Sequence, residues 1–100
     1  MRIHWSPHAR AQAREIFSYI ARDRPDVAHE LLHGFIERVR LLGDLPSQGE
    51  IVSGAGRGDL RAVIYRSYRI VYRVRSAEIA ILSVRHTRMQ AQDSIPEDDG

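Results

Sequence analysis

Arginine is the residue type in this sequence whose number and position are best suited to chemistry. All fifteen basic residues are Arg, and eight of them lie in residues 57–88 beside only two acidic residues, which gives that segment a net charge of +6. Residues 1–56 are neutral overall, and residues 89–100 carry four acidic residues and no Arg. Guanidinium groups gathered in this way bind phosphate groups or acidic protein segments. Residues 57–88 are therefore the predicted binding region.

The spacing of these Arg residues predicts which of them share a face of a sheet. Alternate side chains of an extended strand point the same way, which places Arg69, Arg73 and Arg75 on one face. We expect that face to be open to solvent, because several guanidinium groups would be costly to bury under helices without partners. The other predicted members of this basic face are Arg61, Tyr65, Arg85 and Arg88.

Two interpretations of the basic face stay open. The exposed face of an antiparallel sheet is normally polar, so the Arg side chains can simply be solvated. Alternatively, the face binds a phosphate backbone or an acidic protein segment, and Tyr65 beside the guanidinium planes would stack on nucleic acid bases. The high local charge favours binding.

The histidines offer weaker candidates. His29 and His33 have the four-residue spacing at which two imidazoles on a helix can share a metal ion, but no third ligand is suitably placed, so no metal site is predicted. His86 stands between Arg85 and Arg88, where a neutral imidazole could act as a general base. An ordinary surface histidine at the end of a strand is the alternative. The sequence has no glycine-rich phosphate loop, nucleophile elbow or paired carboxylates.

The elements that must position these residues follow from the hydrophobic pattern. Residues 2–5 alternate as a strand, and Ser6 is suited to cap a helix. Apolar residues three and four apart then predict one helix over 7–22 and a second from Pro25 to a C-cap near Gly43. The two helices would form an antiparallel hairpin.

After a flexible glycine-containing connection over 46–58, the apolar period changes from 3.6 to two. Alternation over 60–65, 68–75 and 79–84, with short links, predicts a three-stranded antiparallel meander. The predicted class is α+β with the order βααβββ and with the helices packed on one face of the sheet.

A single domain over residues 1–89, followed by an acidic and flexible tail over 90–100, is predicted. No apolar run approaches the roughly 20 residues of a membrane span, and the N-terminus lacks the apolar stretch of a secretion signal. The absence of Cys excludes disulfides and thiolate metal sites. We therefore expect a cytoplasmic protein with no cofactor.

Several segments, in this order, resemble a known family over about residues 2–88. The most specific are Leu60-Arg61, Tyr-Arg-Ile-Val-Tyr at 68–72 and Ile-Leu-Ser-Val-Arg-His at 81–86. The family that they resemble is the RelE/ParE superfamily of bacterial toxins. The remaining segments of the resemblance are 3–7 with Ala9, 16–20, 24–28 and 45–49.

This resemblance implies the toxin half of a type II toxin–antitoxin pair, with a cognate antitoxin as partner. In superfamily members that cut mRNA on the ribosome, basic residues of the sheet hold the phosphate, and Arg69 matches one of them. A fixed guanidinium there would stabilise the charge that develops during attack on phosphorus. An endoribonuclease built on this chain would use Arg61, Arg69, Arg85, His86 and Arg88.

The sequence departs from the nuclease pattern in two places. The lysines expected before the central hairpin are absent, and Met89 and Gln90 follow Arg88 where a C-terminal Tyr or another acid/base residue is expected. Both departures resemble the ParE branch, whose members poison DNA gyrase without a nuclease set. Three functions remain: a gyrase inhibitor that is not an enzyme, a ribosome-dependent mRNA endonuclease, and a non-toxic relic that only binds its antitoxin.

Overall fold

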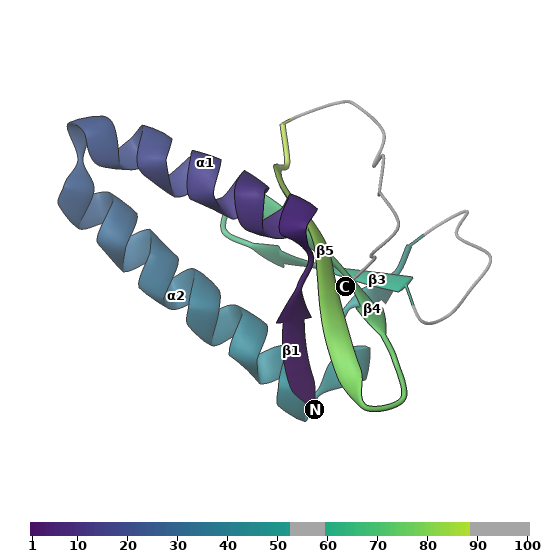
Figure 1. Ribbon diagram of the computed structural model, residues 1–100. Coiled ribbons are helices and arrows are strands. Elements are labelled where there is room, and N and C mark those ends of the chain that lie inside the picture. The colour runs from purple at the N-terminus through teal and green to yellow at the C-terminus, as the bar shows by residue number, and fades with distance from the viewer. Residues whose placement is uncertain (53–59, 89–100) are drawn as a thin grey trace.

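The computed structural model describes residues 1–52 and 60–88, and its elements follow the predicted order (Figure 1). Strand β1 (Arg2–Trp5) leads into helix α1 (Pro7–Asp23), and helix α2 (Pro25–Asp44) runs back beside it. The predicted tail over 90–100 and residues 53–58 of the glycine-containing connection lie outside the described residues. None of the helices in the described part of the chain is long and apolar enough to cross a bilayer.

Within residues 1–52 and 60–88, five strands form one sheet in the order β1-β5-β4-β3-β2. The predicted meander is confirmed as β3 (Leu60–Tyr65), β4 (Tyr68–Val74) and β5 (Glu78–His86), with antiparallel pairing throughout. β1 pairs in parallel with β5 at one edge of the sheet. At the other edge, a short 3-10 helix, η1 (Pro46–Gln48), precedes strand β2 (Glu50–Ile51), which pairs with β3. The connection was predicted to be flexible throughout, but it contains η1 and β2. The sequence contains no sign of β2, because a strand of two residues is too short to show an alternating hydrophobic pattern.

Both helices pack on one face of the sheet, as predicted (Figure 1). Ser6 begins α1 as its N-cap, and its Oγ accepts a hydrogen bond of 3.1 Å from the Ala9 amide. The α2 stripe that faces the sheet meets fully buried aromatic and aliphatic side chains of the central strands. The buried residues of this inner core are Ala9, Phe35, Val39, Leu42, Val63, Ile70, Tyr72, Ile79, Ile81 and Val84.

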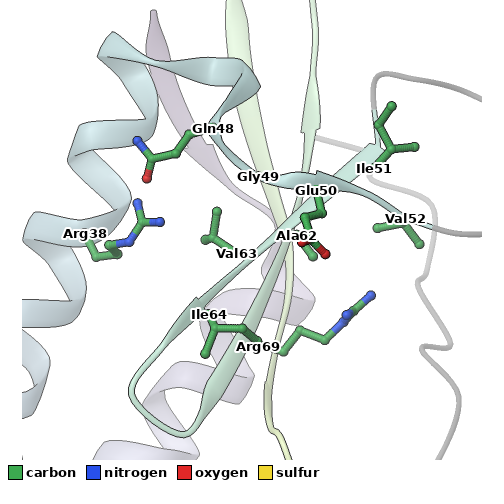
Figure 2. Close-up of a pocket in the computed structure, with 10 residues that line it drawn as sticks. All are labelled: Arg38, Gln48, Gly49, Glu50, Ile51, Val52, Ala62, Val63, Ile64 and Arg69. Carbon is green, nitrogen blue, oxygen red and sulfur yellow. The ribbon is translucent and has the colours of Figure 1, made fainter.

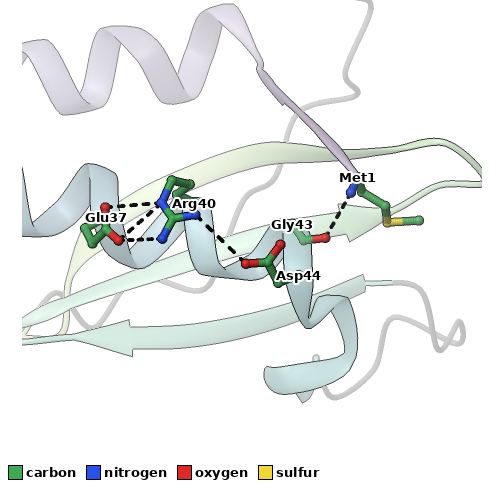
Figure 3. A network of polar contacts seen from close by, with 5 residues as sticks. All are labelled: Met1, Glu37, Arg40, Gly43 and Asp44. Atoms are coloured by element: carbon green, nitrogen blue, oxygen red, sulfur yellow. Dashed lines mark hydrogen bonds and ion pairs between the residues drawn. The ribbon is translucent and has the colours of Figure 1, made fainter.

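The C-terminal end of α2 is tied to the beginning of β1 (Figure 3). The N-terminal amino group of Met1 donates to the carbonyl of Gly43 at 2.9 Å, and a Cβ on Gly43 would lie 2.9 Å from the Met1 carbonyl oxygen. Gly43 therefore allows a close approach of β1, whereas the predicted role as a C-cap is wrong because α2 continues to Asp44. On the exposed side, Arg40 bonds Glu37 and lies 3.9 Å from the Asp44 carboxylate, and the Arg40 hydrogen bond lowers the pKa of Glu37.

A β-bulge interrupts the pairing between β4 and β5. Tyr72 pairs with Ile81, but the preceding residue Val71 pairs with Ser83, so Leu82 is an extra residue in β5. The bulge reverses the side-chain alternation for the rest of the strand, because one added residue exchanges the two faces of a sheet. The uninterrupted alternation predicted for this strand therefore ends at the bulge.

The outer face of the sheet differs from the open Arg platform that was predicted. Val71, Ala80 and Leu82 are no more than 1% exposed, and with Leu60 and Ala62 they form a second apolar cluster on this face. The prediction considered the charged members of the alternation and gave no weight to the small apolar residues between them. The Arg side chains of the outer face are therefore set around a buried apolar centre.

Two core-facing side chains hold the loop between α2 and β2. The Tyr72 hydroxyl donates to the Pro46 carbonyl at 2.8 Å and accepts from the Gly49 amide at 2.9 Å. Arg61 donates to the Gly49 carbonyl at 2.8 Å and to the Ser47 carbonyl at 3.3 Å. Burial of the phenol raises the pKa of Tyr72 above its ordinary value.

Candidate binding surfaces

Arg69 and Arg85 lie directly opposite each other on β4 and β5, on the outer face of the sheet. Arg73 lies further along β4, and Arg75 follows the end of that strand. All four side chains are partly buried, whereas Arg88 is exposed in the turn after β5. Like charges in directly opposite positions repel each other. The pairing of Arg69 with Arg85 therefore places two positive charges side by side on this face.

Arg61 and Tyr65 do not belong to this basic face. The register between β3 and β4 places Arg61 beside Tyr72, on the side of the helices, where it bonds the η1 loop. Tyr65 packs against Phe35 with 6.0 Å between ring centroids and is part of the inner core. The prediction that both residues share a face with Arg69 is wrong, because the face of each strand is fixed by cross-strand pairing rather than by the strand's own pattern.

His86 also faces the helices, and it lies within β5 rather than beyond it. Its ring makes an edge-on contact with Tyr68, with 5.4 Å between centroids. The Nδ1 atom accepts a hydrogen bond of 3.0 Å from the Arg88 amide, which assigns the proton of the neutral ring to Nε2. The bulge is the cause of this placement, since it sends Arg85 to the outer face and the next residue to the inner one.

A groove of about 450 Å³ lies between α1 and the ends of β4 and β5. Its floor is tied together by Gln12, whose Oε1 accepts the Val84 amide at 2.7 Å. Tyr19, which is 71% exposed, stands at its rim. Sequence reasoning did not identify this groove, because its helix residues are spaced as an ordinary amphipathic surface. Its lining is Gln12, Glu15, Ile16, Tyr19, Ile20, Tyr68, Val84, Arg85 and His86.

A second groove of about 420 Å³ lies between α2 and the β2–β3 edge of the sheet (Figure 2). Arg38 enters it from α2, and Arg69 lines it from β4. Sequence reasoning missed Arg38, although a signal was present. Arg38 stands three residues after Phe35 and four before Leu42, which places a charged residue within the apolar stripe of the helix.

No group of three His, Cys, Asp or Glu side chains within residues 1–52 and 60–88 could hold a metal ion. His29 and His33 are near each other on α2, with 6.5 Å between ring centroids, and both are exposed. They therefore form a pair of surface side chains on one turn of the helix.

The candidate nuclease residues are divided between the two faces of the sheet. Arg69 and Arg85 lie on the outer face, whereas Arg61 and His86 lie on the inner face. A general base must reach the same substrate that the cationic side chains hold, within hydrogen-bonding distance. Arg85 and His86 both line the groove beside α1. Arg61 and Arg69 do not line that groove, so the structure does not bring the whole candidate set around one position.

The fold is that of small toxins from toxin–antitoxin systems. A solved structure described as the chromosomal ParDE toxin–antitoxin system from P. aeruginosa matches with a TM-score of 0.72 at 22% sequence identity, covering 88% of this chain and 97% of that one. A family model described as the ParE toxin of the type II toxin–antitoxin system parDE matches residues 3–91. The chain therefore belongs to the ParE toxin family. A comparison with curated proteins gave no match.

Proposed function

We propose that this protein is a toxin that inhibits DNA gyrase and is neutralised by a cognate antitoxin. Membership of the ParE toxin family supports the toxin class and implies an antitoxin partner. The observation that carries the choice of a non-nucleolytic toxin is the position of His86, on the opposite face of the sheet from Arg69 and Arg85. A nuclease would need its base and its cationic side chains around one phosphate.

The outer basic face is the proposed contact surface for an anionic partner. It includes Arg69 and Arg85 as an adjacent pair, and Arg73, Arg75 and Arg88 around them. Guanidinium groups in such a cluster form paired hydrogen bonds with carboxylates or phosphates. This arrangement would contact either an acidic surface of gyrase or DNA that gyrase holds.

The test is a supercoiling assay with purified gyrase and relaxed plasmid. We expect the protein to lower the rate of supercoiling and to increase the amount of cleaved DNA held by gyrase. A combined Arg69→Gln and Arg85→Gln variant should lose most of this effect, whereas Arg14→Gln on the exposed surface of α1 should keep it. Gyrase activity and cleavage that are unchanged by the wild-type protein would exclude gyrase as the target.

One observation favours an RNA target instead. Arg69 and Arg85 lie side by side on one face of the sheet, where two guanidinium groups could bind a phosphate of the RNA backbone. Primer extension on translated mRNA after induction separates this alternative from the proposal. New cuts that disappear with Arg69→Ala would establish the endonuclease. Normal growth on expression without the antitoxin, together with antitoxin binding, would instead identify a non-toxic relic.

A further inference from the structure

In the groove between α2 and the β2–β3 edge, one buried nitrogen of the Arg38 guanidinium, Nη1, has no hydrogen-bond partner among the described residues. A buried guanidinium N–H without an acceptor costs free energy, so this position favours an incoming anion. Figure 2 shows the Arg38 side chain directed toward the same space as Gln48 and Val63. Glu50, which is the only carboxylate among the described residues that line the groove, is exposed and does not supply the missing acceptor.

The backbone beside Arg38 is an open sheet edge. β2 pairs with only Arg61 and Ala62 of β3. The Val52 amide donates to the Leu60 carbonyl at 2.9 Å, so Leu60 directs its polar backbone groups toward β2. In an antiparallel ladder every second residue does the same, which directs the N–H and C=O of Ile64 toward this side, beyond the end of β2. An extended segment could therefore pair with β3 next to Arg38.

Apolar side chains border the groove on both sides of this edge. Ile51 is 57% exposed and Ile64 is 53% exposed, and both line the groove. A buried Nη1 can be reached by a carboxylate on a slender side chain, whereas a phosphodiester carries a ribose on each side. The combination of one buried guanidinium nitrogen, exposed isoleucines and the backbone of Ile64 beyond the end of β2 suits a protein segment better than a nucleic acid.

We propose that this groove binds an acidic side chain on an extended segment of the antitoxin, with its carboxylate accepting a hydrogen bond from Arg38 Nη1. Apolar residues on either side of that acidic residue would cover Ile51 and Ile64. This inference rests on the proposed function, because it assigns one subsite of the antitoxin that the toxin is expected to bind.

The experiment measures, by calorimetry, binding of the product of the adjacent gene to the wild-type toxin and to two variants. Arg38→Met removes the charge and keeps an aliphatic stem, and Arg40→Met is the matched control because Arg40 is exposed on the same helix and bonds Glu37. We expect Arg38→Met to raise Kd at least ~10-fold, as for the loss of a buried charge-assisted hydrogen bond. The control should remain within about twofold, and gyrase inhibition should be unchanged in both variants.

The outcomes separate this inference from the proposed function. No complex with wild-type toxin would reject the antitoxin partnership itself, and a normal complex with equal Kd for Arg38→Met and wild type would overturn the subsite alone. The midpoint temperature of thermal unfolding should be no lower for free Arg38→Met toxin than for free wild-type toxin, because the substitution removes a buried donor that has no partner among the described residues.

Substitutions in the antitoxin provide a second test that does not depend on whether Arg38→Met folds. Each acidic residue of the antitoxin is changed to its amide, and one position should reproduce the loss with wild-type toxin. Combining that change with Arg38→Met should cost little more than either change alone. The assignment is wrong if the effects of every pair of substitutions on Kd are additive. It is also wrong if a single-stranded RNA oligonucleotide competes with the antitoxin for this groove, as followed by the NMR signal of the Arg38 side chain.

Discussion

Single side chains in this protein take roles that their type alone does not indicate. Tyr72 is fully buried among apolar residues, yet its hydroxyl bonds both the Gly49 amide and the Pro46 carbonyl. Arg61 makes a similar attachment from β3. Two residues in the meander therefore fix the loop that forms one wall of the Arg38 groove, and the shape of that groove depends on hydrogen bonds made from inside the core.

Replacement of Tyr72 by Phe tests this role. We expect the free energy of unfolding to fall by about 1–3 kcal/mol, because the Gly49 amide loses its buried acceptor. The measurement is urea denaturation at neutral pH. Tyr19→Phe, at a 71% exposed position, is the control and should leave stability unchanged. An equal effect of both substitutions would contradict the structural role.

Tyr72 also predicts how stability changes at alkaline pH. Burial raises the pKa of the folded phenol above the ordinary value of 10.0, so the unfolded chain loses this proton first. The contribution is fully present below pH 10 and is lost as pH rises through the folded pKa. Wild-type stability should therefore decline more steeply above pH 10 than that of Tyr72→Phe, as measured by denaturation at a series of pH values.

At the scale of elements, the approach of the Tyr65 side chain of β3 to α2 depends on a glycine within the helix. A Cβ on Gly34 would lie 2.0 Å from the Tyr65 hydroxyl and 3.1 Å from the ring carbon that carries it. The Tyr65 ring is held against Phe35, so it cannot move away freely. Glycine has a low helical propensity, but at this position its missing Cβ leaves room for the Tyr65 side chain.

Gly34→Ala measures that packing. In an exposed helix the change would stabilise by about 1 kcal/mol, but here we expect a loss of about 1–3 kcal/mol because the methyl group overlaps Tyr65. Tyr65→Phe removes the nearest atom and should recover part of the loss. Denaturation of the two single variants, the double variant and the wild type gives the coupling. Simple additivity would show that the two residues do not collide.

At the scale of the whole molecule, charge is distributed unevenly although the net charge is only +2. The Arg residues gather in the last three strands, and the tertiary structure divides them among the outer face, the η1 loop and the groove beside α2. An anionic partner of the outer face would be attracted over about one Debye length, which shortens as salt rises.

The inhibition of gyrase should therefore depend on ionic strength. We expect the potency of the wild-type toxin to fall between roughly 50 and 200 mM salt, and the fall to be smaller for the combined Arg69→Gln and Arg85→Gln variant. The supercoiling assay at several salt concentrations provides the measurement, with Arg14→Gln as control. If all three proteins respond equally to salt, the outer Arg pair does not contribute to the contact.

The sequence by itself determined the elements and the class of fold. Ser6 and Pro7 begin α1, the apolar stripe of α2 faces the sheet, and the change of period after residue 58 produces the meander, because these signals act over a few neighbouring residues. It also determined the family, since the ordered segments spread over the chain agree with the matching family model.

The tertiary structure alone decided which functional candidates share a face. The register of β3 on β4 turned Arg61 toward the helices, and the bulge at Leu82 decided that Arg85 lies on the outer face and His86 on the inner one. Neither event has a short-range signal, because register and bulges are set by pairing between distant strands. Arg38 was likewise visible as a charge in an apolar stripe, but only packing against the sheet edge buried its Nη1 atom without a hydrogen-bond partner among the described residues.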